Sequence, residues 1–187
     1  MSRRRLPHVY PEGCWLFATW HLHGSLPRAY YPPPGKPSAG KAFVWMDRYL
    51  DTTRLGPMFL ARPEVASLIV QALQRGVTTG LYDLRAFVVM SNHVHVLFRP
   101  HHEVSRALQW LKGTTAREAN QILDRTGRPF WQHESYDHWV RNQQQMERIV
   151  TYIENNPVQA GLAAEASRYP WSSAWSDDGE LKFAAAR

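Results

Sequence analysis

The chain has 187 residues, of which 44% are hydrophobic and 20% charged, and it carries a formal net charge of +6. This composition is typical of a folded globular protein and excludes a disordered or collagen-like chain. The length suits a single domain over 1–187. The only cysteine, Cys14, excludes an internal disulfide framework and a cysteine-based zinc cluster within one chain.

The first half of the chain predicts a strand, a long loop and a helix. Residues 14–24 ("CWLFATWHLHG") are rich in aromatic and branched side chains, which is typical of a strand. The segment at about 25–42 is dense in Pro, Gly and Ser, so we expect a loop or flap, either functional or disordered. Residues 62–76 have apolar side chains at helical spacing, with Pro63 near the start and Gly76 at the end, and predict a helix.

The second half predicts a hairpin followed by two helices. Residues 82–90 and 93–100 read as two strands joined by the tight turn Ser91-Asn92. A second helical pattern covers 103–127, with Gly113 as a point where it could be interrupted. Downstream of it we expect an extended segment over 129–141, a third helix from 143 that stops at Pro157, and a tail from about 162. This order predicts an α+β fold, a ferredoxin-like βαββαβ core with an antiparallel sheet and an added C-terminal helix.

His93 and His95, in "SNHVHVL", are the first candidate functional residues. A strand alternates its side chains between two faces, so both imidazoles point the same way, two rises of ~3.3 Å apart. Neutral imidazole is a common metal ligand, and two of them could hold a divalent ion that keeps positions open for a substrate. The alternative is a pair of solvated or hydrogen-bonded histidines on an open sheet face.

The third predicted helix carries a second candidate site. Tyr152 and Asn156 lie four residues apart, one turn above the other, at the edge of the apolar stripe of this helix. A core tyrosine and an asparagine that satisfies the end of the chain are the alternative roles. Helix geometry alone favours those structural roles for both residues.

Three segments in this order, "SNHVHVL", "FWQHESYDHWVR" and "YIENNPVQAGL", resemble the REP-associated tyrosine transposases. These belong to a wider group of single-strand DNA nucleases with a His-hydrophobic-His motif. The similarity runs from about Trp15 to Trp175 and is interrupted by the Pro-rich segment. It implies a ferredoxin-like fold whose central sheet carries the histidine pair, with the nucleophile on a nearby helix. Ser91 stands where the common form of the motif has proline, which would loosen the turn and leave the chemistry intact.

The resemblance implies a role for each matched residue. His93 and His95 would be metal ligands, Tyr152 the nucleophile, and Asn156 a third, polar ligand. Tyr136 is the rival nucleophile, ranked lower because it lies outside the helix and has no ligand partner four residues on. The ion would be Mg²⁺ or Mn²⁺, since oxygen ligands favour both and imidazole favours Mn²⁺. Attack by Tyr152 would give a 5′-phosphotyrosine and a free 3′-hydroxyl, a step that a second 3′-hydroxyl could reverse without ATP.

The implied partner is single-stranded DNA, with short palindromic hairpins flanked by a single-stranded guide sequence. Basic residues are candidates for phosphate contacts: Arg3, Arg4, Arg5, Lys112, Arg117, Arg141 and Arg148. Tryptophans that could stack on bases, or belong to the core, are Trp110, Trp131 and Trp139. No membrane or protein partner is expected. The expected location is the cytoplasm, because neither a membrane span nor a secretory signal is visible. The segment after Gly161 favours a monomer over a dimer.

Two other functions remain open. A domesticated protein of the same fold would recognise hairpin DNA without cutting it, but the presence of both histidines together with Tyr152 and Asn156 disfavours such a role. A metal-dependent hydrolase would use water as the nucleophile, with Tyr152 structural, and would form no covalent protein–DNA adduct.

Overall fold

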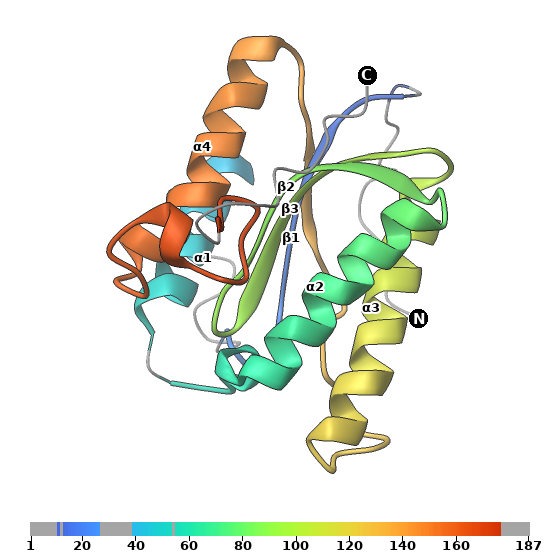
Figure 1. The fold of residues 1–187 in the computed structure, drawn as a ribbon, viewed down its shortest axis with the longest axis vertical. Helices are drawn as coiled ribbons and strands as arrows, with labels where there is room; N and C mark the ends of the chain where they lie inside the picture. Colours follow the sequence, from blue (N-terminus) through green and yellow to red (C-terminus); the bar gives the residue numbers. More distant parts are fainter. Residues whose placement is uncertain (1–10, 12, 27–38, 54, 177–187) are drawn as a thin grey trace.

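The protein folds around one antiparallel sheet, seen in the computed structural model, which describes residues 11, 13–26, 39–53 and 55–176 (Figure 1). The elements in chain order are β1 (Leu16–His21), α1 (Ala39–Thr52), the 3₁₀ turn η2 (Phe59–Ala61), α2 (Pro63–Thr78), β2 (Tyr82–Val89), β3 (His93–Pro100), α3 (Val104–Ile122), β4 (Tyr136–Trp139), α4 (Gln143–Gln159) and the 3₁₀ turn η3 (Ala166–Arg168). Among the described helices, none is long and apolar enough to cross a membrane.

The strand order β2-β3-β1-β4 places the expected hairpin beside the N-terminal strand. β3 pairs with β2 on one side and with β1 on the other, and β1 also pairs with β4, all antiparallel. The order confirms the predicted α+β class and agrees with a ferredoxin-like core, in which each helix crossover joins two strands that a third strand separates. In the β1–β3 register, Thr19 lies opposite His95 and His21 opposite His93.

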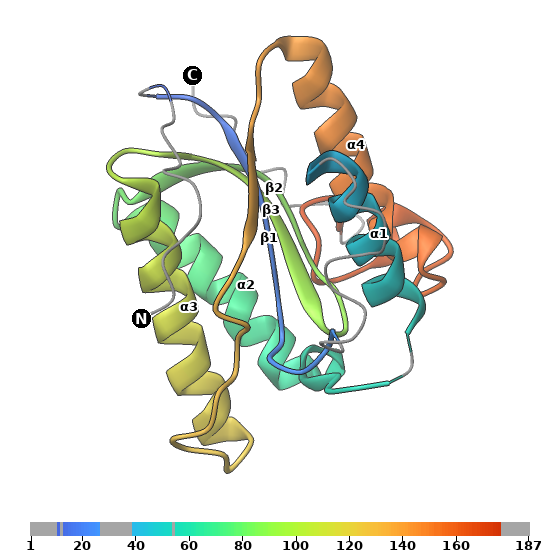
Figure 2. The same ribbon diagram turned by 180° about the vertical axis from the view of Figure 1, so that it is seen from behind.

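Helices cover both faces of the sheet (Figures 1 and 2). Helices α2 and α3 lie on one face, where they bury the apolar side chains of β1 and β3 in one core cluster, including Trp20, Val94, Val96 and Phe98. Helices α1 and α4 lie on the opposite face, with a smaller apolar cluster that includes Phe17 and Ile153. Because side chains alternate along β3, His93 and His95 belong to this second face.

The hairpin turn forms where the sequence predicts it. The backbone N–H of Met90 donates to the carbonyl of His93, and Val89 pairs with Val94 across the turn. The Asn92 side chain then donates from Nδ2 to the carbonyl of Leu50, which connects the turn to α1. The turn is thereby fixed to the helix that faces the histidines.

Three helices differ from the predictions. Helix α3 is continuous through Gly113, and α2 extends two residues beyond Gly76. Gly76 serves close packing instead of ending the helix, because a Cβ there would lie 2.1 Å from the hydroxyl of Tyr82. Helix α4 continues past Pro157 to Gln159, since a proline in the last turn removes only one backbone donor and the Ala160 N–H still donates to Asn156.

Helix α1 is the main element that the sequence does not predict. It begins at Ala39, inside the segment expected to be a loop at about 25–42, of which residues 27–38 lie outside the described part of the chain. Met46 and Leu50 are buried, and their spacing is that of an amphipathic helix. The helix therefore presents one face to the sheet, on the side of the histidine pair.

Candidate functional site

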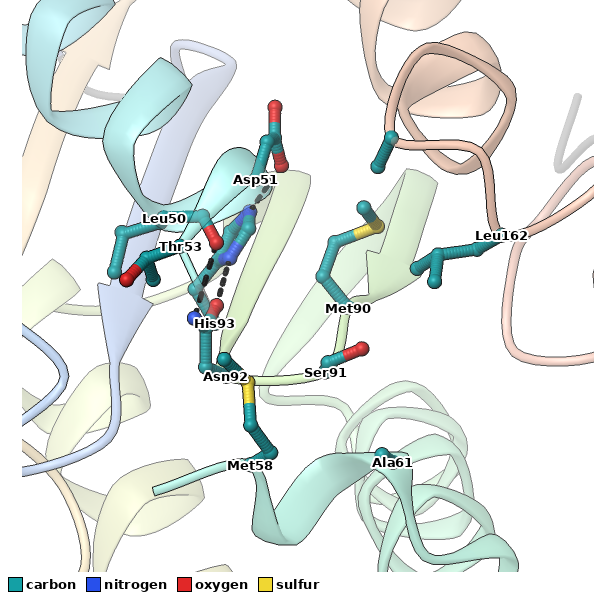
Figure 3. A pocket seen from close by; sticks show the side chains of 11 residues that line it. Leu50, Asp51, Thr53, Met58, Ala61, Met90, Ser91, Asn92, His93 and Leu162 are labelled. Carbon is teal, nitrogen blue, oxygen red and sulfur yellow. Dashed lines mark hydrogen bonds and ion pairs between the residues drawn. The ribbon is translucent and has the colours of Figure 1, made fainter. Parts of the chain in front are cut away.

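The two histidines of β3 meet through their Nε2 atoms. Both side chains are fully buried, and the distance from His93 Nε2 to His95 Nε2 is 3.0 Å. The predicted same-face arrangement is therefore correct, whereas an open, solvated sheet face is excluded. Their Nδ1 atoms point outward from the pair and make contacts of 2.7 Å, His95 with Thr19 Oγ1 and His93 with Asn92 Oδ1 (Figure 3).

The contact with Asn92 determines which ring nitrogen of His93 carries the proton. Asn92 donates from Nδ2 to Leu50, which turns its Oδ1 toward His93. An amide oxygen can only accept, so His93 Nδ1 carries the hydrogen and Nε2 keeps a lone pair. Burial, and next the neighbouring His95, lower the pKa of His93 to about 3, so the ring is neutral at physiological pH. A neutral imidazole with a free Nε2 and a second ring contact is the form in which histidine binds metals.

Two carboxylates from α1 complete the cluster, and the sequence analysis did not select them. Asp47 Oδ1 lies 3.1 Å from His95 Nε2 and 3.9 Å from His93 Nε2, and Asp51 Oδ1 lies 3.5 Å from His93 Nε2. Asp47 and Asp51 are four residues apart in a helix, so both reach the same side. That i, i+4 spacing beside the apolar residues of α1 is the signal that could have found them.

The cluster has more acceptors than hydrogen atoms to satisfy them. One Nε2–H on His95 could point at His93 or at Asp47, not at both, and the Oδ1 atoms of Asp47 and Asp51 are buried with no hydrogen bond of good geometry from any described residue. Ligand atoms of Asp47, His93 and His95 lie within 4.8 Å of one another, close enough to share one cation. Buried polar atoms are costly unless something pairs with them, so this donor set fits a divalent ion.

The charges of the two carboxylates differ. Burial alone would raise the pKa of Asp47, but its contacts with His95 and then with His93 bring the pKa below its ordinary value. Burial, and next the charge of Asp47, raise the pKa of Asp51 to about 7. Asp47 is thus an anion throughout the physiological range, whereas Asp51 gains its charge near neutrality.

Tyr152 and Asn156 of α4 face the same cluster. The Tyr152 ring lies 5.5 Å from the His95 ring, centroid to centroid, and its Oη is buried with no hydrogen-bond partner among the described residues. Asn156 is fully buried, and in the described part of the chain neither its Oδ1 nor its Nδ2 has a partner. One turn further, Ala160 lines a cavity together with His93. The helical row 152–156–160 therefore runs along the histidine pair, with the Asn156 amide between its ends.

Tyr136, the rival nucleophile, lies on the same face but further from the histidines. It pairs with Thr19 across β1 and β4, and its ring stacks on Phe43 at 4.2 Å. Phe43 also contacts the His95 ring, at 6.4 Å, and so lies between Tyr136 and the pair. Burial, and next the charge of Asp137, raise the pKa of Tyr136, which makes its phenolate harder to form.

The predicted DNA contacts divide between the two faces of the sheet. Lys112 and Arg117 lie on α3, away from the histidines, and Lys112 donates to the carbonyls of Gln132 and His133. Arg148 is exposed on α4, one turn before Tyr152, and Arg141 lies over the Trp139 ring. Arg3, Arg4 and Arg5 lie outside the described residues.

The three tryptophans proposed for base stacking differ in exposure. Trp131 is buried in the core and donates from Nε1 to Thr115, and Trp110 packs against the same core cluster. Trp139 is the exposed one, with 36% of its surface accessible. Only Trp139 therefore presents enough of its ring to be free for stacking.

The fold is similar to that of a protein of known structure. A REP-associated tyrosine transposase bound to a REP hairpin has a structure similar to this chain, with a TM-score of 0.61 and 18% identity over 100% of this chain and 98% of that one. A presumed transposase from Deinococcus radiodurans R1 aligns with a TM-score of 0.46 and 18% identity over 81% of this chain and 97% of that one. No curated protein sequence matches the chain.

The family comparison is based on sequence. The profile described as "Transposase IS200 like" matches residues 60–156, just over half of the chain, from η2 to Asn156. The matched part includes the histidine pair and the Tyr152–Asn156 row, and the similarity to tyrosine transposases expected from the three sequence segments is confirmed. The chain belongs to the IS200-like transposase family.

Proposed function

We propose that this transposase is a metal-dependent transesterase that cuts and rejoins single-stranded DNA beside short hairpins through a 5′-phosphotyrosine. The observation that carries the proposal is the position of the buried Tyr152 hydroxyl, which has no partner among the described residues, beside a cluster of buried acceptors that a cation would satisfy. A tyrosine that served packing alone would have no need of a hydroxyl there, since burying it without a partner costs stability.

The ion would be held by His93, His95 and Asp47, with Asn156 as a further polar ligand from α4. The neutral Nε2 atom of His93 and the ionised carboxylate of Asp47 are suited to Mn²⁺ or Mg²⁺, and the imidazoles favour Mn²⁺. When bound, the ion would polarise the scissile phosphate and stabilise the negative charge that develops on it. Asn92 and Thr19 would hold the two rings in orientation through their Nδ1 contacts.

Tyr152 would supply the nucleophile. Its oxygen attacks the phosphorus, and the bond from phosphorus to the 3′ oxygen breaks. The phenol loses its proton and the departing 3′ oxygen gains one, directly or through solvent. The phosphate then links the Tyr152 oxygen to the 5′ oxygen of the nucleotide that follows the cut. A free 3′-hydroxyl of another strand can then attack the same phosphorus and release the tyrosine, so that cleavage and joining are one reaction in two directions.

The rigid setting of Tyr152 would place it for this attack. The ring packs edge-on against Phe17 at 6.0 Å and against Phe43 at 6.4 Å, so neighbours from β1 and α1 limit its movement. Positioning of a nucleophile is one of the larger contributions that an enzyme makes to rate. The relative of known structure holds a REP hairpin, which supports hairpin DNA as the substrate.

The experiment uses hairpin DNA with randomised single-stranded flanks, labelled at the 5′ or the 3′ end, with Mn²⁺ or Mg²⁺. Wild type should form a protein–DNA adduct on a denaturing gel, and mass spectrometry should locate it on Tyr152. Tyr152→Phe should abolish the adduct and the cleavage, with hairpin affinity retained, while Tyr136→Phe should cut like wild type. Cleavage by Tyr152→Phe would refute the proposal: with an adduct it would assign the nucleophile to Tyr136, and without one to water. Hairpin binding by wild type with neither product would identify a domesticated DNA-binding protein.

A further inference from the structure

A cavity of about 230 Å³ is lined by His93, one of the two histidines of the pair (Figure 3). Its floor is the β2–β3 turn, from Met90 to His93, and its walls come from the end of α1, from η2 and its neighbour Met58, and from the end of α4. His93 therefore belongs both to the cavity and to the cluster that would hold the ion. None of the roles assigned to the metal cluster or to Tyr152 uses this space.

The size and place of the cavity restrict what could fill it. Pockets for drug-sized ligands span roughly 300–1,000 Å³, so this one suits a single ring system and not a whole nucleotide. A phosphate at the ion would lie next to His93, and the aromatic ring nearest to a scissile phosphate in single-stranded DNA is the base of an adjoining nucleotide. A base leaves its stack at little cost when the strand is single.

The apolar lining suits an aromatic ring. Met58 and Met90 line the cavity with thioether groups, which make favourable contacts with aromatic rings and adapt to their shape. Leu50 and Leu162 close two further sides. Flat, apolar faces of a base would be desolvated there, as they are on the stacking platforms of other single-strand binders.

Two polar groups would read the edge of that ring. One carboxylate oxygen of Asp51 pairs with His93, and the other points away from it (Figure 3). The hydroxyl of Ser91, the residue that replaces the proline of the common motif, lines the cavity and makes no hydrogen bond within the described residues. A carboxylate accepts hydrogen bonds and repels carbonyl oxygens, so it favours an exocyclic amino group, as when an acidic residue accepts from cytosine N4.

We propose that this cavity binds the base of a nucleotide next to the scissile phosphate and selects a base with an exocyclic amino group, namely cytosine, adenine or guanine, over thymine. The position next to the scissile phosphate rests on the proposed function, whereas the binding of an unstacked base does not. The protein itself would then read one position of its target, independently of any pairing between DNA segments.

The test measures base selection by binding, in a Tyr152→Phe background that cannot cut. A pool of hairpins with randomised single-stranded flanks is bound in the presence of Mn²⁺, and the bound fraction is sequenced. The parent should show one flank position where the three amino-bearing bases exceed thymine by about tenfold. Ala61→Phe, which places a ring in the cavity, should remove this bias, and Ala164→Phe, at an equally exposed alanine outside the cavity, should leave it unchanged. Asp51→Ala should keep the position occupied but lose the discrimination against thymine.

The outcomes separate this inference from the chemistry. A bias that Ala61→Phe does not change, or an unbiased bound pool, would overturn the cavity assignment even if Tyr152 forms its adduct. A bias that disappears in Ala61→Phe supports base binding even if no adduct is found. Where cleavage occurs, the biased position should adjoin the mapped cut, and a position further along the strand would overturn the placement beside the scissile phosphate.

Discussion

The two faces of β3 are built from alternate residues of one eight-residue strand, yet they differ in almost every physical respect. Toward α2 and α3 the strand presents Val94, Val96 and Phe98, all fully buried among apolar neighbours. Toward α1 and α4 it presents His93 and His95, equally buried but next to acceptors that have no partner in the described part of the chain. Burial of apolar side chains on the first face stabilises the folded chain, whereas the buried polar atoms on the second face cost stability.

This contrast shows where the protein tolerates instability. A buried polar atom without a partner costs on the order of 1–3 kcal/mol, and the cluster on the second face has several. Packing on the first face supplies the compensating stability, so a strained and polar arrangement can persist. Substitutions on the two faces should therefore have different effects. Those on the first face should affect folding, and those on the second should affect metal binding and cleavage.

The largest effect is expected from His93→Ala combined with His95→Ala. Loss of both imidazoles would remove the proposed ion and with it about 4 kcal/mol of stabilisation of the developing charge, so cleavage should fall about a thousandfold or more. Mn²⁺ raises the Tm of a protein that binds it only in the folded state, and this rise should disappear in the double variant. The measurements are the cleavage assay and thermal unfolding with and without Mn²⁺.

The matched control is Phe98→Ala, on the opposite face of the same strand. It should lower the free energy of unfolding by about 3–5 kcal/mol, as expected for a buried phenylalanine, while the folded fraction still shows a Mn²⁺-dependent rise in Tm. A double histidine variant that retains both the rise in Tm and cleavage would exclude the proposed metal site.

A smaller effect is expected from Asp47→Asn. The variant keeps the shape of the side chain but loses the anionic oxygen, 3.1 Å from His95 Nε2 in the native protein. We expect Mn²⁺ affinity, measured by calorimetry, to fall about 10–100-fold, the range seen when groups around a metal are removed. Asp83→Asn, which changes an aspartate paired with Arg99 instead, should bind Mn²⁺ like wild type. Unchanged affinity in Asp47→Asn would mean that Asp47 is not a ligand.

The sequence predicts the histidine face well and the α1 contribution not at all, for a physical reason. Strand alternation and a helical turn are local rules, so the common direction of His93 and His95 and the spacing of Tyr152 and Asn156 follow from the chain itself. Asp47 reaches His95 only through tertiary packing, which joins α1 to a strand that is more than 40 residues away along the chain. The predicted stop at Pro157 is wrong although it follows a local rule, because the rule that proline stops a helix is weak in the last turn.

Asp51→Asn should change how stability depends on pH in the metal-free protein. The pKa of Asp51 is raised to about 7, so between about pH 4 and 7 the folded state holds a proton that the unfolded state has lost. Stability contributed by this proton is fully present below the ordinary pKa of aspartate and is lost as the pH rises toward 7. The variant lacks this group and does not lose this stability. As the pH rises from about 4 to 7, it should therefore gain stability relative to wild type, by up to about 1.4 kcal/mol per pH unit.

The buried His93 has the opposite effect on how stability depends on pH. Its pKa is lowered to about 3, so between about pH 3 and 6.5 the unfolded state binds the additional proton and stability rises with pH. The two slopes offset each other in wild type, whereas Asp51→Asn should expose the rising slope of His93. Urea unfolding in chelator from pH 4 to 8 tests this, and parallel curves for the two proteins would show that Asp51 is not held protonated.

The smallest effect compares two arginines on opposite faces of the sheet. Arg148 is exposed on α4, one turn before Tyr152, and Arg117 is exposed on α3, with 72% of its side chain accessible. If DNA lies along the histidine face, Arg148→Ala should lower the slope of log affinity against log salt by about 1 and weaken all sequences alike, because phosphate contacts carry no sequence information. Arg117→Ala should leave the slope unchanged, since α3 lies behind the sheet from Tyr152 (Figure 2). Equal losses in both variants, measured by fluorescence anisotropy over a salt series, would instead mean that the DNA passes around the edge of the sheet to reach α3.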